Sequence, residues 1–301
     1  MAAEVARAVA RVPAWASART VRITPLSGGL TNRTFRVDAD DEAFVARLWA
    51  PEAAVLGVER AREQACAAAA ARLGIAPEVV CVLPDVGLMV TRFVAGRPLV
   101  PGEPAPTPVV RRVAEAVRRY HQGPPVPGVY TPLRTVDAYL DTARQHGVLV
   151  PADLPAMRAR LTPLADVLDA SARLVPCHND LWGANLVDDG TQVWIVDWEY
   201  AAMGDPYFDL ATFAIYHAPE DTADAALLAA YAGTVRPAAF ARLKLYRLVA
   251  LLRDAAWYLA AMTLPIATPA FADAAAAHLA RLRQALADPR VPAWSTAARD
   301  A

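Results

Sequence analysis

Residues 177–185 read CHNDLWGAN, and residues 193–199 read VWIVDWE. These stretches supply an aspartate, Asp180, an asparagine five positions later, Asn185, and a second aspartate, Asp197, at the end of a short apolar strand. His-x-Asp or Asp-Trp-Glu alone arises readily by chance. The ordered combination of loop, asparagine, strand and aspartate is much more specific, so we take it as the feature that decides the fold.

Phosphoryl transfer from ATP needs this set of groups. One carboxylate, which we assign to Asp180, orients the acceptor hydroxyl and takes its proton. The amide oxygen of Asn185 and the carboxylate of Asp197 are hard donors that would hold the magnesium ion on the phosphates. The residues therefore predict an ATP- and Mg²⁺-dependent phosphotransferase, with Asp180 catalytic and with Asn185 and Asp197 as metal ligands.

The arrangement resembles the catalytic loop and metal-binding aspartate of the protein-kinase-like superfamily. HND at residues 178–180 stands where protein kinases have HRD, and DWE at residues 197–199 stands where they have DFG. This wording is similar to the choline kinase and aminoglycoside phosphotransferase branch, especially the bacterial choline and ethanolamine kinases. The resemblance implies an α+β, bilobal protein-kinase-like fold with a small β-rich N-lobe and a larger, mostly helical C-lobe. It runs from about Leu26 to Trp257, and the helices after Met262 match no motif.

The composition excludes other classes of protein. A chain of 301 residues with 55% hydrophobic content suits two lobes, and its net charge of −1 offers no basic surface for nucleic acid. No apolar run reaches the about 18 residues of a membrane span, because the longest, residues 248–264, is broken by Arg253 and Asp254. The N-terminus lacks the apolar core of a signal peptide. We expect a soluble, cytoplasmic protein that binds neither nucleic acid nor membranes.

The three cysteines indicate ordinary thiols. Cys66, Cys81 and Cys177 are odd in number and have no metal-ligand spacing, which fits a reducing compartment. Although Cys177 lies beside the catalytic loop, we expect it to be a buried residue without a chemical role.

Hydrophobic periodicity divides the chain near residue 96. Before that point the pattern predicts an amphipathic helix to about Ser17, one helix over 58–73, and strands over 21–23, 34–37, 44–48, 79–82 and 88–93. Four prolines between residues 100 and 108 mark a loop. Beyond it, helices are predicted over 109–121, 136–146, 155–168, 206–217, 221–232, 238–262 and 270–286. We therefore expect an N-lobe over residues 1–96 and a C-lobe over residues 97–301.

A glycine-containing segment, LSGGLTN at residues 26–32, lies between two predicted strands. Adjacent glycines let a backbone approach phosphates and exposed amides bind anions, although a plain hairpin turn uses the same residues. The segment resembles the GGLTN phosphate loop of bacterial choline kinases. The resemblance implies nucleotide contacts from Ser27, Gly28, Gly29, Leu30, Thr31 and Asn32. No Gly-Lys-Ser/Thr follows, so it is not a Walker loop.

Two further nucleotide contacts are implied by the resemblance. Arg47 ends the third predicted strand, where protein kinases place the lysine that pairs with the phosphates. Its expected partner is Glu63 in the next helix, and Glu59 on the same helix face is the rival. The hinge between the lobes is expected around Thr91 and Phe93, where backbone groups would hydrogen-bond adenine.

The segment GDPYFDLA at residues 204–211 matches the GDPxxDLA signature of the branch. There the second aspartate, here Asp209, braces the catalytic loop by accepting its backbone amides, and we expect Asp209 and His178 to support the structure. Asp205 is placed to N-cap the helix that begins at Pro206.

Choline kinases hold the trimethylammonium head of choline in an aromatic cage, where each ring contributes roughly 0.5–2 kcal/mol. The resemblance assigns Tyr200 and Trp257 to that cage, with Glu199 or Asp205 adding longer-range attraction. The expected acceptor is therefore a small, cationic amino alcohol, most simply choline or ethanolamine.

Two positions depart from the family pattern. Tyr216, seven residues after the second aspartate, is often acidic in choline kinases, and Ala260 stands where the animal enzymes carry a second tryptophan. An enlarged pocket at these positions would suit thiamine or an aminoglycoside, which remain alternative acceptors. A non-catalytic, kinase-like nucleotide-binding module is the alternative from another class, and the intact Asp180, Asn185 and Asp197 argue against it. Oligomeric state leaves no trace in the sequence.

Overall fold

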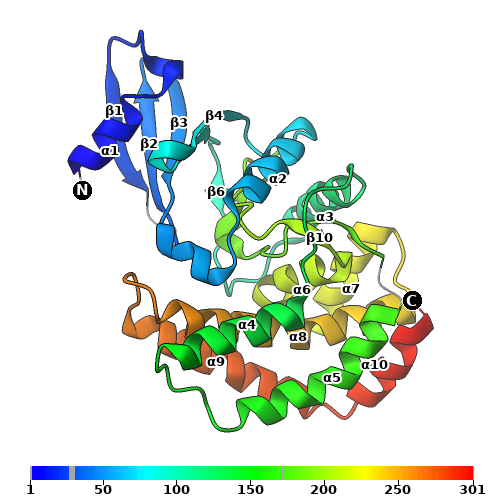
Figure 1. Cartoon of the computed structure of the whole chain (residues 1–301). Coiled ribbons are helices and arrows are strands. Elements are labelled where there is room, and N and C mark those ends of the chain that lie inside the picture. Colours follow the sequence, from blue (N-terminus) through cyan, green and yellow to red (C-terminus); the bar gives the residue numbers. More distant parts are fainter. Residues whose placement is uncertain (1, 27–30, 171–172, 301) are drawn as a thin grey trace.

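A computed structural model describes residues 2–26, 31–170 and 173–300 of the chain. Figure 1 shows a small lobe built on a β-sheet and a larger lobe built from helices, joined by the chain segments between them. The small lobe comes from the N-terminal part of the sequence and the helical lobe from the remainder. This α+β, bilobal architecture is the one that the sequence predicted.

The N-terminal sheet has five antiparallel strands in the order β1-β2-β3-β5-β4. The strands are β1 (Val21–Leu26), β2 (Arg33–Ala39), β3 (Glu42–Leu48), β4 (Val79–Leu83) and β5 (Leu88–Arg92). All five were predicted, with ends that differ by a few residues. In the register of the sheet, Arg47 on β3 lies between Thr34 of β2 and Met89 of β5. Arg47 is therefore paired on both sides, one residue before the end of β3.

The first residues of the chain cover one face of this sheet. Helix α1 (Ala2–Val9) is shorter than predicted, because the chain before Pro13 becomes extended at Val12 and only one further turn, Pro13–Trp15, follows. Trp15 packs on Phe44 with ring centroids 5.1 Å apart, and its indole N–H donates to the Val9 carbonyl at 2.8 Å. The segment without a matching motif thus completes a separate N-lobe core.

Helix α2 (Arg60–Arg72) belongs to the N-lobe and packs against the C-lobe (Figure 1). It begins two residues later than predicted, because Glu59 still has an extended backbone, with φ −113° and ψ 111°. Its small buried residues, among them Cys66 and Ala70, pack into the main core that also contains the C-lobe helices. Ala-rich composition suits this position, since small side chains allow the helix to lie close to its neighbours.

The C-lobe is a set of helices packed around α8 (Pro237–Ala261). Its other helices are α3 (Thr107–His121), α4 (Pro132–Gln145), α5 (Leu154–Ala170), α6 (Pro206–His217), α7 (Asp221–Ala232), α9 (Pro269–Leu286) and α10 (Val291–Ala297). Helix α8 contacts α4, α6 and α9 most extensively. Its central position explains why its apolar residues surround it on all sides. Helix α10 was not predicted.

Short strands flank the catalytic loop. They are β6 (Arg97–Pro98), β7 (Val175–Cys177), β8 (Leu186–Asp188), β9 (Val193–Ile195) and β10 (Ala202–Gly204). They form one sheet in the order β6-β8-β9 and a second pair, β10-β7. Only β9 was predicted, because two or three residues are too few to show an alternating pattern. Among the described residues, no helix is both long enough and apolar enough to cross a membrane.

Candidate active site

The catalytic loop leaves β7 after Cys177 and enters β8 at Leu186, and Asp209 holds its first turn. Asp209 lies in the first turn of α6 and is 1% exposed. Its carboxylate accepts the backbone N–H groups of His178 at 2.8 Å and Asn179 at 2.5 Å. Hydrogen bonds from two amides to a buried carboxylate fix the loop strongly. The geometry is that of the brace expected for Asp209, and His178 belongs to the same support.

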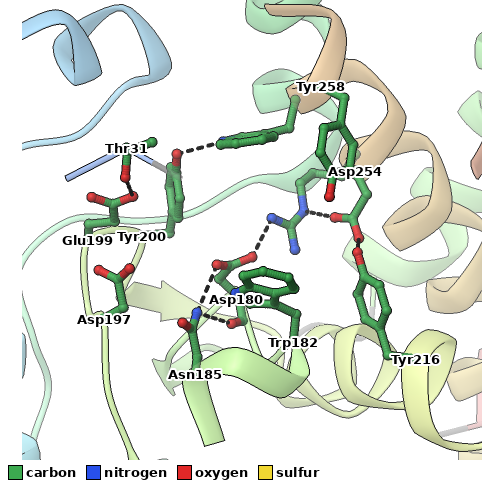
Figure 2. A pocket seen from close by; sticks show the side chains of 12 residues that line it. Thr31, Asp180, Trp182, Asn185, Asp197, Glu199, Tyr200, Tyr216, Asp254 and Tyr258 are labelled. Atoms are coloured by element: carbon green, nitrogen blue, oxygen red, sulfur yellow. Dashed lines mark hydrogen bonds and ion pairs between the residues drawn. The ribbon is translucent and has the colours of Figure 1, made fainter. Parts of the chain in front are cut away.

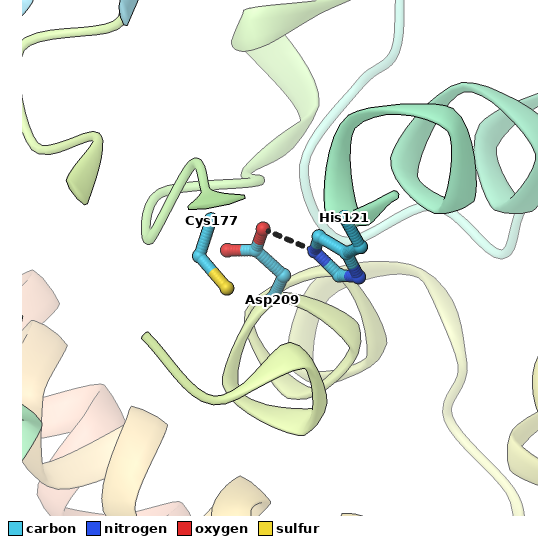
Figure 3. A group of neighbouring side chains, drawn as sticks. All are labelled: His121, Cys177 and Asp209. Atoms are coloured by element: carbon cyan, nitrogen blue, oxygen red, sulfur yellow. Dashed lines mark hydrogen bonds and ion pairs between the residues drawn. The ribbon is translucent and has the colours of Figure 1, made fainter. Parts of the chain in front are cut away.

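Asp209 is supported in turn by α3 and α7. His121 places Nε2 3.0 Å from the Asp209 carboxylate and Nδ1 2.8 Å from the Tyr231 hydroxyl. Figure 3 shows His121, Cys177 and Asp209 together, with ligand-type atoms within 4.8 Å of one another. His121 and Asp209 are engaged in the brace, and burial raises the pKa of the Cys177 thiol well above its usual value. A metal would need the thiolate, so we interpret this group as structural.

Two non-glycine residues of the site have a left-handed backbone. Both Asn179 and Asp197 have φ +64°, a conformation that asparagine and aspartate adopt more readily than other residues. The Asn179 amide secures its own position by donating to the Tyr200 carbonyl at 3.0 Å. Such backbone conformations are common where a chain must turn side chains into a functional site.

Asp180 lies in a pocket that Figure 2 shows from close by. Its carboxylate accepts from Asn185 Nδ2 at 3.1 Å and from the Arg253 guanidinium at 2.8 Å. Burial raises the pKa of Asp180, while the charge of Arg253 acts in the opposite direction. Asp180 is thus oriented by one neutral and one charged donor.

Asn185 and Asp197 are brought to the same pocket by the β8–β9 pair. The Val196 N–H donates to the Asn185 carbonyl at 3.0 Å, which sets the two residues on neighbouring chain segments. Asn185 Nδ2 donates to Asp180, which leaves the Asn185 amide oxygen available as a metal ligand, and the Asp197 carboxylate lines the same pocket. An amide oxygen and a carboxylate are hard ligands of the kind that magnesium takes, so both residues suit the metal role expected for them.

Arg47 forms ion pairs with both Glu63 and Asp197. Glu63 is fully buried and Arg47 is 8% exposed. The rival acid, Glu59, is exposed and pairs with Arg62 instead. A single guanidinium therefore links the sheet to α2 and to Asp197, which lies two residues after β9.

Glu199 forms hydrogen bonds with N-lobe side chains beside the site. Its carboxylate accepts from the Thr31 hydroxyl at 2.8 Å, the Asn32 amide at 2.9 Å and Arg60 at 3.3 Å. Burial and the neighbouring Asp197 raise the pKa of Glu199. Arg60, which the sequence interpretation missed, also pairs with Glu63. Glu199 borders the pocket, but both of its oxygens are engaged by N-lobe side chains.

Other residues expected at the nucleotide are placed as follows. Ser27, Gly28, Gly29 and Leu30 lie outside the described residues. At the hinge, Thr91 is within β5, and the Phe93 N–H donates to the Ala43 carbonyl at 3.0 Å. The Phe93 amide is therefore occupied by the sheet, and only its carbonyl would be open to an adenine.

Aromatic side chains form the far wall of the pocket (Figure 2). Tyr200 and Trp257 both line it, and the Trp257 indole N–H donates to the Tyr200 hydroxyl at 2.8 Å. Trp182, Tyr216 and Tyr258 complete the aromatic lining. The cavity has a volume of about 60 Å³.

The aromatic wall of the pocket also contains an acidic residue, Asp254, which lies on α8 and not on α6. Tyr216 on α6 donates its hydroxyl to Asp254 at 2.6 Å, and Asp254 pairs with the neighbouring Arg253 at 2.9 Å. Asp254 thus occupies the region where the sequence departure at Tyr216 had removed an acid. A signal was present in the sequence, because Arg253 and Asp254 interrupt the apolar run of residues 248–264.

Two residues that the sequence associated with the acceptor do not line this pocket. Asp205 does N-cap α6, accepting from the Tyr207 N–H at 2.9 Å, but its carboxylate is buried against Arg242 and does not line the pocket. Ala260 is fully buried and also does not line it. The space beside Ala260 is filled by other side chains, so the pocket is not enlarged there.

The fold and this site define a phosphotransferase of the kinase-like type. The model of the phosphotransferase enzyme family matches residues 22–246, and the chain belongs to that family. A choline/ethanolamine kinase family protein from Mesorhizobium loti is 30% identical, with all of both chains covered and a TM-score of 0.83.

Two other comparisons support this placement. The choline kinase LicA of Streptococcus pneumoniae has the same fold, with a TM-score of 0.80 at 17% identity, over 94% of this chain and 99% of that one. Protein LicA of Haemophilus influenzae is 27% identical over 195 residues, which are 62% of this chain and 55% of that protein. The chain therefore matches about half of that relative's length.

Proposed function

We propose that this protein is an ATP- and Mg²⁺-dependent kinase that transfers the γ-phosphate to the hydroxyl of a small amino alcohol, choline or ethanolamine. The observation that carries the proposal is the position of Asp180. It lies in a small cavity whose lining also includes aromatic rings, the carboxylate of Asp254 and the guanidinium of Arg253. A hydroxyl bound there would reach Asp180 while its cationic end faced the rings.

Each residue of the site has a role in this proposal. Asp180 accepts the hydrogen bond of the acceptor hydroxyl and takes its proton late in the reaction. Arg253 and Asn185 hold the Asp180 carboxylate in the orientation that this needs. Asn185 and Asp197 would hold magnesium, which neutralises charge on the transferring phosphate.

The N-lobe residues are assigned to the nucleotide. Arg47, kept in place by Glu63, is the cation for the phosphates. The glycine segment, with Ser27, Gly28, Gly29 and Leu30 together with Thr31 and Asn32, would cover the phosphates, and the hinge at Thr91 and Phe93 would contact adenine. A solved structure of LicA in complex with AMP supports a nucleotide site in a protein of this fold.

The size of the cavity favours a small acceptor. One water needs about 10–15 Å³ of such volume, so a cavity of about 60 Å³ holds only a few heavy atoms. That suits ethanolamine or the head group of choline. Thiamine and aminoglycosides have rings for which the buried Ala260 leaves no additional room.

The chemistry of the walls favours a cationic acceptor. Tyr200, Trp182, Trp257 and Tyr258 offer aromatic rings, which attract an ammonium group through their negative faces. Asp254 adds a carboxylate at the same wall, although Arg253 balances part of its charge. A neutral acceptor would gain little from this lining.

An assay coupled to ADP release tests the proposal. The acceptor panel contains choline, ethanolamine, thiamine and an aminoglycoside, and the Asp180→Asn variant supplies the background of ATP hydrolysis. We expect the highest kcat/KM with choline or ethanolamine. Turnover of another acceptor alone would overturn the choice of acceptor, and no turnover of any acceptor above the background would favour the non-catalytic nucleotide-binding module.

A further inference from the structure

A second cleft lies in the C-lobe, outside the site described above. It has a volume of about 490 Å³ and is bordered by α7, α8, α9 and the segment that leads into α10. Tyr216 borders both cavities, but its hydroxyl points to Asp254 in the first. No role in phosphoryl transfer accounts for the second cleft.

Basic side chains dominate the lining of this cleft. Lys244, Arg247, Arg281 and Arg290 all border it. Three carboxylates neutralise part of this charge: Lys244 contacts Asp221 at 2.7 Å and Asp224 at 2.8 Å, Arg247 pairs with Asp224, and Arg290 contacts Asp221 at 2.5 Å and Asp288 at 2.7 Å. Four cations against three carboxylates leave one positive charge in excess.

The excess charge is located at Arg281 on α9. Among the ion pairs between described residues, Arg281 has no carboxylate partner, and its guanidinium donates to the backbone carbonyl of Ile215. Burial lowers the pKa of Arg281 and the charge of Arg247 lowers it further, while Tyr216 and Asp254 act in the opposite direction. Two guanidinium groups that repel each other across a cleft would be stabilised by an anion between them.

We propose that this cleft binds a small phosphate-type anion, either inorganic phosphate or a phosphate monoester, through Arg281 and Arg247. The planar guanidinium donates two parallel hydrogen bonds to a tetrahedral oxyanion. Lys244 adds a third positive charge that is 11% exposed and held by its two carboxylates. The Trp294 ring keeps the rim cations in place, with Arg290 4.8 Å and Lys244 5.4 Å from its centroid.

This proposal does not depend on the proposed function. Within the described part of the chain, Asp180, Asn185 and Asp197 form no hydrogen bond or ion pair with a residue that lines this cleft. An anion bound at Arg281 would therefore occupy a site separate from any phosphate held by the catalytic loop.

Isothermal titration of the full-length protein with inorganic phosphate, at constant ionic strength set by sodium chloride, tests the proposal. The variants are Arg281→Gln and, as a matched control two residues further along the same helix, Arg283→Gln. Arg283 is 45% exposed and pairs with Asp153 away from the cleft. We expect Arg281→Gln to weaken phosphate binding by about tenfold or more, as removal of a charged hydrogen-bond donor does. The control should bind as the wild type.

A second variant covers the case in which Arg281→Gln does not fold. Ala285→Glu places a carboxylate on the cleft wall one turn from Arg281, and it should abolish the same binding event without removing a guanidinium. The proposal is overturned if the wild type shows no phosphate binding, or if the folded cleft variants bind phosphate as tightly as the wild type and the Arg283→Gln control.

Discussion

At the scale of single residues, the site depends on a few buried charges with defined partners. Asp180 is held by Asn185 and Arg253, and Arg47 joins Glu63 to Asp197. An unpaired charge in such a position is costly, because water no longer solvates it. Changes at these residues should therefore affect the chemistry and the local geometry together, and matched controls are needed to separate the two effects.

Replacing Asp180 with asparagine should lower kcat by orders of magnitude and leave ATP affinity near that of the wild type. The amide can still occupy the space, but it cannot take the proton of the acceptor hydroxyl. Turnover is measured by ADP release and ATP affinity by direct titration. If the variant kept most of the wild-type kcat, Asp180 would not be the catalytic residue.

Replacing Trp257 with alanine should weaken binding of a quaternary amine by about 0.5–2 kcal/mol and affect a neutral acceptor less. Trp257→Phe is the matched control, because it keeps a ring while losing the indole N–H that reaches Tyr200. The measurement is KM for choline and for a neutral alcohol with each variant. An equal loss for both acceptors would indicate that Trp257 only packs the helix core.

At the scale of elements, short strands and helix ends position the side chains of the site. Three-residue strands set the ends of the catalytic loop, and α6 presents Asp209 at its N-terminal turn, where backbone amides can reach the carboxylate. Helix α2 in turn carries Glu63 to the edge of the sheet. Each of these elements contributes one side chain whose position depends on the packing of the whole element.

The brace formed by Asp209 can be tested by Asp209→Asn. The amide nitrogen would face backbone N–H groups, so at least one hydrogen bond is lost and the loop is released. We expect a loss of about 1–3 kcal/mol in the free energy of unfolding, together with a lower kcat. Chemical denaturation measures the first effect, and the exposed Asp141→Asn should stay within about 0.5 kcal/mol of the wild type. An unchanged stability would contradict the brace.

The contact between the sheet and α2 can be tested by Arg47→Ala. Loss of the guanidinium should raise the KM for ATP and lower kcat, because the phosphates are then less well positioned. The control is Arg72→Ala, at the exposed end of α2, which should leave the KM for ATP and kcat unchanged. A variant with normal KM for ATP would show that Arg47 supports structure only.

At the scale of the whole molecule, the lobes meet through polar contacts around the site. Thr31 and Asn32 from the N-lobe both donate to Glu199 from the C-lobe, and Arg60 reinforces them. These contacts lie beside the segment expected to cover the phosphates. Under the proposed function, these contacts would link nucleotide binding to the relative position of the lobes.

Thr31→Val and Glu199→Gln should loosen this link. Thr31→Val removes a hydrogen bond to the buried Glu199 carboxylate, and Glu199→Gln removes its charge. We therefore expect a larger radius of gyration in the protein without ligands and a higher KM for ATP. Small-angle X-ray scattering and steady-state kinetics provide the two readouts. Thr296→Val on α10 is the control, and identical scattering of all variants would refute the role of the contacts.

The sequence alone determined the elements whose patterns are long and the motifs whose residues are contiguous. The five strands of the N-terminal sheet and the helices α3 to α9 follow from periodicity, because burial of one face repeats along many residues. The grouping of Asp180, Asn185 and Asp197 follows from their close spacing, since a loop and one short strand pair bring them together.

Only the tertiary structure decided the features that depend on contacts between distant segments. Asp254 reaches Tyr216 across 38 positions, and Glu199 meets Thr31 across 168, so no local pattern identifies either pair. Asp205, an acid next to the site in sequence, is turned away because α8 supplies Arg242 as its partner. Packing of α6, α8 and the N-lobe loop selects which acids face the pocket, and that selection is a property of the folded chain.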